Sequence, residues 1–196
     1  MINGNEDAEE GHTHQEGGGA LNEFDGAIRE ATLERIRLTI LTTSKDARVI
    51  VSSELQQSEF LSDLDVPDHS GAYFHAYRAL DGYLDAVVVR PTLDVIMEPL
   101  AHEVQSSALS PHRVLQSRFV RQLRDAALRS ICSTNEIAMN LLREVHAFDE
   151  LGAFRNSVFH SFEEPRRNDV THCASLVQRV VDIIESQREA AERAAG

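Results

Sequence analysis

Three polar side chains in one short segment have the types and spacing needed for acid–base chemistry on a phosphate ester. The segment 151–162 reads LGAFRNSVFHSF and contains Arg155, Asn156 and His160. A histidine titrates near neutral pH and can give or take a proton, and an arginine fork binds two phosphoryl oxygens. Asn156 can hold the phosphate or orient His160. RNA carries its own nucleophile, the 2′-hydroxyl, so these groups would need no metal and no other cofactor to cleave it.

The same segment has the periodicity of an amphipathic helix at about 100° per residue. Its apolar face consists of Leu151, Phe154, Val158 and Phe162. Asn156 and His160 are i,i+4 neighbours, whereas Arg155 and His160 are about 140° apart around the helix. All three side chains can therefore meet one ligand only if the segment lies at a helix end or if a second copy of the chain completes the site.

The pattern Arg155-Asn156-x-x-x-His160 resembles the motif of the HEPN superfamily, R-x(4 to 6)-H with a polar residue often following the arginine. The resemblance extends over roughly residues 133–187 and implies an all-α antiparallel helical bundle, here with additional N-terminal helices. It also implies a homodimeric, metal-independent endoribonuclease in which Arg155, Asn156 and His160 are catalytic. Members of the superfamily act as toxins paired with an antitoxin or as effectors of anti-phage defence. In one toxin branch a modifiable tyrosine follows the histidine by two positions; Phe162 stands there, so we do not expect that mode of control.

A second copy of the pattern, Arg167-Asn168-x-x-x-His172, requires a different interpretation. It lies among turn and helix-capping residues, Pro165, Asp169 and Thr171, which introduce the last apolar stretch. We therefore interpret this second match as a solvated helix cap. Its presence shows how readily so short a pattern arises.

A row of arginines precedes the motif on a predicted amphipathic helix. These arginines, which lie opposite an apolar side, are Arg113, Arg118, Arg121, Arg124 and Arg129. Such a row could follow an RNA backbone, because sequence-independent affinity comes from neutralising phosphates. The alternative is a solvated face whose arginines pair with the many carboxylates of the chain.

The composition limits the kinds of partner. The formal net charge is −13 over 196 residues, so the chain as a whole is a poor general nucleic-acid binder and any RNA contact must be local. Its two cysteines provide neither a disulfide framework nor a zinc pattern. No apolar run is long enough for a membrane span, and the N-terminus has no signal-peptide pattern, so a cytoplasmic protein is expected.

The domain organisation expected from these patterns is simple. Residues 1–22 form a disordered acidic tail, and residues 23–194 form a single helical domain. Residues 47–53 are β-branched and short, and they fit either a strand or a helix. The other helices are expected at 23–44, 54–64, 73–89 (ended by Pro91), 92–107 (interrupted by Pro99), 110–131 (beginning at Ser110-Pro111), 133–148 (capped by Ser133), 151–162 and 168–194.

A second function is compatible with the same residues. The acidic tail and the net charge also suit a non-catalytic helical module, HEPN-like or not, that binds a partner protein or a nucleotide. Arg155 and His160 would then be structural or would bind a ligand, and RNA would remain intact.

Overall fold

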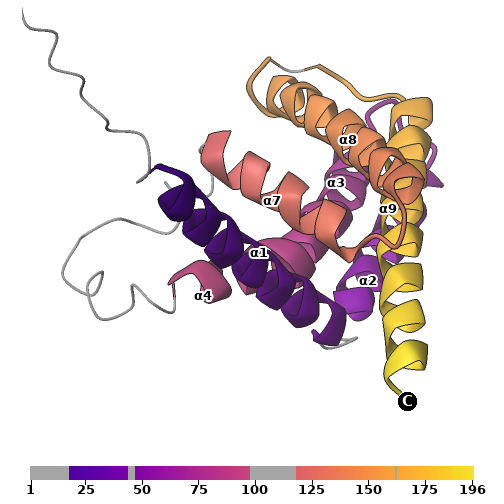
Figure 1. Cartoon of the computed structure of the whole chain (residues 1–196). Coiled ribbons are helices and arrows are strands. Elements are labelled where there is room, and N and C mark those ends of the chain that lie inside the picture. The colour runs from indigo at the N-terminus through magenta and orange to yellow at the C-terminus, as the bar shows by residue number, and fades with distance from the viewer. Residues whose placement is uncertain (1–17, 44–46, 98–117, 162) are drawn as a thin grey trace, which may run out of the picture. The chain divides into compact units, whose positions relative to one another are not determined.

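The computed structural model describes residues 18–43, 47–97, 118–161 and 163–196, without the side chains of 18–29, 97, 118–120 and 159–161 (Figure 1). Every regular element in this part of the chain is a helix, which confirms the predicted all-α class. None of the described helices is long and apolar enough to cross a membrane. The chain divides into two compact units, Met1–Ala31 and Thr32–Gly196, with the boundary inside the first helix.

The helices are connected by short loops where the intervening residues are described. In chain order they are α1 (Gly18–Thr42), α2 (Ala47–Ser62), α3 (Ser70–Leu84), the π-helix η1 (Asp85–Val89), α4 (Arg90–Met97), α7 (Arg118–Ile131), α8 (Asn135–Ser161) and α9 (Arg167–Ala195). Within the second unit, α3 packs against α2, α9 and α8, and α8 also packs along α9. Figure 1 shows α8 in orange beside the yellow α9.

Helix α3 is at the centre of the core because its apolar residues recur at helical spacing. Tyr73, Tyr77 and Leu80 are all buried, and the same stripe continues through Leu84 to Val87 and Val88. On α9 the predicted inward residues are also buried: Cys173, Leu176, Val177, Val180, Val181 and Ile184. Burying such a side chain contributes about 1.5–3 kcal/mol, so these two stripes hold the unit together.

Pro91 does not end the third helix, and that prediction is wrong. The chain passes from α3 through η1 into α4, with Pro91 as the second residue of α4. A proline lacks the backbone N–H and its ring clashes with the carbonyl four residues earlier, and a wider π-turn relieves such a conflict. In addition, the Thr92 hydroxyl donates to the Val88 carbonyl oxygen at 2.6 Å, so this buried acceptor stays paired.

The break predicted near Asp149 to Gly152 is also absent, because α8 runs unbroken from Asn135 to Ser161. Its cap is shifted by one residue from the prediction. The Oγ1 atom of Thr134, rather than that of Ser133, accepts a hydrogen bond from the Ile137 N–H at 3.3 Å. The motif is therefore the last part of a long helix, not a helix of its own.

The structure decides one stretch whose sequence fits either a strand or a helix, and it moves one predicted boundary. Residues 47–53 are helical and continue into the predicted 54–64 helix as α2. Helix α1 begins at Gly18, inside the stretch expected to be a tail. The predicted helix start at Ser110-Pro111 and the predicted interruption at Pro99 lie outside the described residues.

A buried ionic cluster joins α9 to α2 and α3. The Glu185 carboxylate accepts hydrogen bonds from the Tyr83 hydroxyl at 2.6 Å and from Arg188 Nη1 at 2.8 Å. Arg48 on α2 reaches the same carboxylate at 3.1 Å. Burial and the neighbouring Glu185 raise the pKa of Tyr83, so its hydroxyl keeps its proton. Glu185 and Arg188 are each 2% exposed. Arg188 is therefore compensated by Glu185, and Glu185 by Arg188 and Arg48.

We expect Arg188→Ala to lower the free energy of unfolding by about 3–5 kcal/mol, because it removes the closest cation from the buried Glu185 carboxylate. Urea unfolding followed by circular dichroism measures this change. Arg193→Ala, at an exposed position of the same helix, is the control and should stay within about 0.5 kcal/mol of the wild type. Equal stabilities of the two variants would contradict the assigned role of the cluster.

Candidate functional site

The motif residues lie near the C-terminal end of α8. The helix ends at Ser161, directly after His160, so the segment meets the helix-end condition under which the three residues can share a ligand. Arg155 is partly buried and Asn156 is exposed, whereas the side chain of His160 is outside the described part of the structure. The backbone thus places all three residues within the last two turns of one helix.

Two tyrosines from α3 hold this part of α8. The Tyr73 hydroxyl donates to the Leu151 carbonyl oxygen at 3.3 Å, and the Tyr73 ring meets the Phe154 ring edge to face at 5.3 Å between centroids. The Tyr77 ring lies under the guanidinium of Arg155, with 5.1 Å between Cζ and the ring centroid. These contacts between helices distant in sequence determine where Arg155 lies.

Arg155 differs from the other partly or fully buried arginines because it has no carboxylate partner. Arg124 is paired with Asp149, and Arg188 is paired with Glu185. For Arg155, in contrast, the described residues contribute no ion pair. Its buried Nε atom also lacks a hydrogen-bond partner, a property that it shares with the Nε atom of Arg188. An unpaired buried donor is costly in a folded protein, and the missing carboxylate partner is what distinguishes Arg155 from Arg124 and Arg188.

Nearby ionisable groups respond to the charge of Arg155. Burial raises the pKa of Tyr77, and Asp81 adds to the shift, while Arg155 opposes it. Tyr77 is therefore neutral near pH 7 and remains a hydrogen-bond donor. Loss of water around its carboxyl raises the pKa of Asp81, and Arg155 again opposes the shift. Arg155 thus acts electrostatically on both side chains without forming an ion pair with Asp81.

The arginine row is only partly on the surface. Arg121 and Arg129 are exposed, as predicted. Arg113 lies outside the described residues, and so does the side chain of Arg118. Placing Arg124 on the solvent face was wrong, because it is 9% exposed. The row therefore does not form one continuous cationic surface on α7.

The interior position of Arg124 follows from the helical spacing of α7. Arg124 is four residues before Leu128, which is fully buried, and so shares its face. Its two terminal nitrogens donate to Asp149 at 2.8 and 2.7 Å. Desolvation alone would lower the pKa of Arg124, but the bonds to Asp149 and the charge of Asp125 raise it overall. The periodicity of the sequence could not predict that Asp149 pairs with Arg124, because the two residues lie on different helices.

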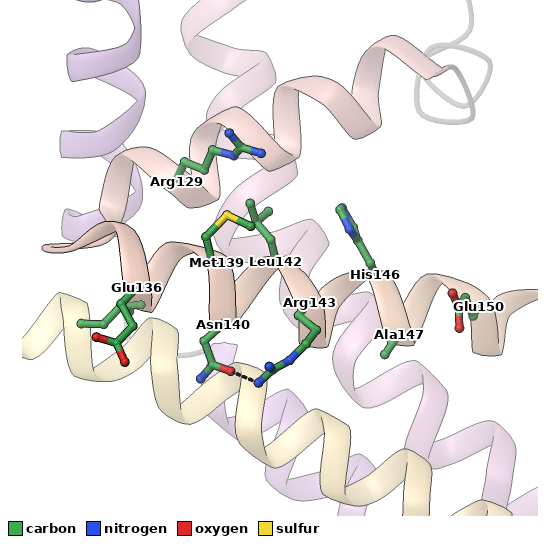
Figure 2. A pocket seen from close by; sticks show the side chains of 10 residues that line it. Arg129, Glu136, Met139, Asn140, Leu142, Arg143, His146, Ala147 and Glu150 are labelled. Atoms are coloured by element: carbon green, nitrogen blue, oxygen red, sulfur yellow. Dashed lines mark hydrogen bonds between the residues drawn. The ribbon is translucent and has the colours of Figure 1, made fainter.

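An open groove of about 1040 Å³ follows the outer face of α8 beside α7. Figure 2 shows Arg129 on α7 above the α8 side chains Asn140, Arg143 and His146. The groove is lined by charges of both signs, because Glu136 and Glu150 lie beside the arginines. No motif residue lines this groove, so the groove and the motif are separate features of α8.

The second copy of the pattern is the start of α9, in agreement with its interpretation as a cap. The Arg166 N–H donates to Asp169 Oδ2 at 2.7 Å, and Arg167 pairs with Asp63 at 2.6 Å. His172 is exposed. In contrast to Arg155, the arginine of this copy already has a carboxylate partner.

The comparisons with known proteins leave the site to be judged on its own geometry. No family model matches the chain, and no curated protein or solved structure shows significant similarity to it. Within the part that the structure describes, no group of three or more potential metal ligands comes together.

The different surroundings of Arg124 and Arg121 predict different mutational effects. We expect Arg124→Ala to lower the free energy of unfolding by about 3–5 kcal/mol, because it leaves Asp149 partly buried and unpaired. Arg121→Ala should change it by less than about 0.5 kcal/mol. Thermal or urea unfolding of the two variants compares them directly, and a stable Arg124→Ala protein would show that the pair is dispensable.

Proposed function

We propose that this protein is a metal-independent endoribonuclease that uses Arg155, Asn156 and His160. The observation that carries the proposal is the partly buried guanidinium of Arg155, which has no carboxylate partner among the described residues of a chain with 32 acidic side chains. A phosphodiester is an anion that such a fork binds in bidentate fashion. The resemblance of the motif to the HEPN pattern points to the same chemistry.

In the proposed reaction the 2′-hydroxyl of RNA attacks the adjacent phosphorus, and the bond to the 5′-oxygen breaks. The products are a 2′,3′-cyclic phosphate and a free 5′-hydroxyl. A base takes the proton of the 2′-hydroxyl and an acid gives a proton to the departing 5′-oxygen, and His160 can serve in either role. Arg155 stabilises the charge that grows on the phosphoryl oxygens, while Asn156 holds the phosphate or orients the imidazole.

The need for two proton transfers favours a homodimer. One chain contributes one histidine to the motif, so a second copy would supply the other acid–base group. Exposed Arg121 and Arg129 are available to neutralise further phosphates of the same RNA. An RNA substrate places the activity in the cytoplasm. The HEPN resemblance implies a role as a toxin with an antitoxin, or as an effector of anti-phage defence.

The proposal is tested by incubating wild-type and His160→Ala proteins with total RNA and tRNA in excess EDTA and analysing the fragment ends. We expect the wild type to release 2′,3′-cyclic phosphate ends and His160→Ala to be slower by about 10²- to 10⁴-fold, because it lacks the proton carrier. His172→Ala is the matched control, since it changes the histidine of the capping copy of the pattern. Equal activity of wild type and His160→Ala would refute the proposal.

A second candidate, a non-catalytic module that binds a nucleotide or a partner protein, is favoured by one feature of the site. Asp81 and Asp149 lie close enough to Tyr77 or Arg155 to influence ionisation there, so the surroundings of Arg155 are not uniformly positive. For this candidate, Arg155→Ala should weaken binding of a nucleotide or partner while RNA stays intact with every variant. Calorimetry beside the cleavage assay separates the two functions.

A further inference from the structure

The guanidinium of Arg155 on α8 packs over the ring of Tyr77 on α3. We call the space that this ring occupies, between Phe148, Gly152 and Arg155, the slot. Phe148, Gly152 and Arg155 follow one another on α8 at spacings of four and three residues, which places them on one face. Tyr77 of α3 enters this face. Its ring is stacked on Phe148, with 4.6 Å between centroids and 23° between planes, and the same ring carries Arg155 at 5.1 Å.

The slot depends on the missing side chain of Gly152. A Cβ atom at this position would lie 3.0 Å from the Tyr77 hydroxyl oxygen and 3.9 Å from Cζ of the same ring. The first distance is shorter than an ordinary contact, whereas the second is not. A side chain at residue 152 would therefore push on the hydroxyl of Tyr77, and removal of that hydroxyl would restore the space.

An aromatic ring supports an arginine in a way that a carboxylate cannot. The ring face attracts the cation through its quadrupole, but it occupies none of the N–H groups that point along the edge of the guanidinium plane. A carboxylate such as Asp149, which takes two N–H groups of Arg124, would compete with a phosphate for the fork. The Tyr77 hydroxyl also interacts with the guanidinium as a hydrogen-bond partner, but it is neutral, and no described carboxylate is paired with the fork.

From this arrangement we infer that Tyr77 is the positioning residue of Arg155: its ring, seated in the slot opened by Gly152, holds the guanidinium ready for a phosphodiester. This inference rests on the proposed function, because it assigns Tyr77 a task in the same site. Tyr77 itself does not contact the substrate. Its phenol stays protonated near neutral pH, since burial raises its pKa, so the ring adds no negative charge beneath the arginine.

The chain offers a matched control for this support. Phe74, also on α3, carries Arg78 over its ring at 5.4 Å. Arg78 additionally pairs with Glu54 at 3.3 Å, so its fork is already engaged. Phe74→Leu thus removes the same kind of contact from the same helix, while Tyr77 and its contact with Arg155 are kept.

The first measurement is the ¹H–¹⁵N NMR signal of the arginine Nε–H groups in the full-length protein. In the wild type, the Arg155 signal should be shifted upfield by the ring current of Tyr77. Tyr77→Leu should abolish that shift, and Tyr77→Phe should keep it. Phe74→Leu should change the Arg78 signal and leave the Arg155 signal shifted. An unchanged Arg155 signal in a folded Tyr77→Leu protein would overturn the inference.

Because Tyr77→Leu could disturb folding through the loss of the Phe148 stack, a second pair of variants tests the same point. We expect Gly152→Ala to weaken binding of a single-stranded oligodeoxynucleotide, which lacks the 2′-hydroxyl and cannot be cleaved by this route, by roughly tenfold through displacement of Arg155. The double variant Gly152→Ala/Tyr77→Phe should bind the oligodeoxynucleotide as tightly as the single variant Tyr77→Phe does. A Gly152→Ala defect that Tyr77→Phe does not repair would count against the slot.

Cleavage assays on the same proteins separate the two proposals. Wild-type protein that binds the oligodeoxynucleotide through Arg155 but leaves RNA intact would refute the proposed ribonuclease, while the Tyr77 and Gly152 variants still decide the positioning role. If Arg155→Ala binds the oligodeoxynucleotide as well as the wild type does, both proposals fail. If Tyr77→Phe retains kcat/KM for RNA cleavage and folded Tyr77→Leu lowers kcat/KM by at least about tenfold, both are supported.

Discussion

The burial of α3, with the polar ends of its three tyrosines, is the constraint on which the rest of the structure depends. A tyrosine contributes a large apolar surface to a core, but its hydroxyl needs a partner when it is buried. Tyr73 finds the Leu151 carbonyl oxygen, and Tyr83 finds the Glu185 carboxylate. Tyr77 lies under Arg155. Through these contacts one central helix sets the positions of both α8 and α9, and therefore of the motif.

The absence of a carboxylate partner at Arg155 is notable because the chain is rich in carboxylates. Glu185 pairs with the buried Arg188, and Asp149 and Asp125 pair with the buried Arg124. With carboxylates so abundant, an arginine held on an aromatic ring instead is an exception that requires a reason. Buried or partly buried cations without partners are costly, and such strained electrostatics are typical of sites that receive a charged ligand.

The success and failure of the sequence analysis have the same physical origin. Helical periodicity correctly predicted the buried stripes of α3 and α9, because a long apolar repeat allows few other structures. It failed at Pro91, where a π-turn and the Thr92 hydroxyl accommodate the proline. The solvent-facing placement of Arg124 was also wrong, because Arg124 shares the face of the buried Leu128. Its carboxylate partner lies on another helix, and a helical wheel contains no information about such a pair. The HEPN resemblance and the roles of Asn156 and His160 remain predictions.

By itself, the sequence determined that the protein is helical, which faces of α3 and α9 are apolar, and that Arg155, Asn156 and His160 follow one another along one helix. These properties are local, since they depend on spacings of three and four residues. Only the tertiary structure decided that Arg124 is neutralised while Arg155 is not, and that Tyr77 fits against Gly152. Such properties arise from contacts between residues distant in sequence, and packing of the whole core selects them.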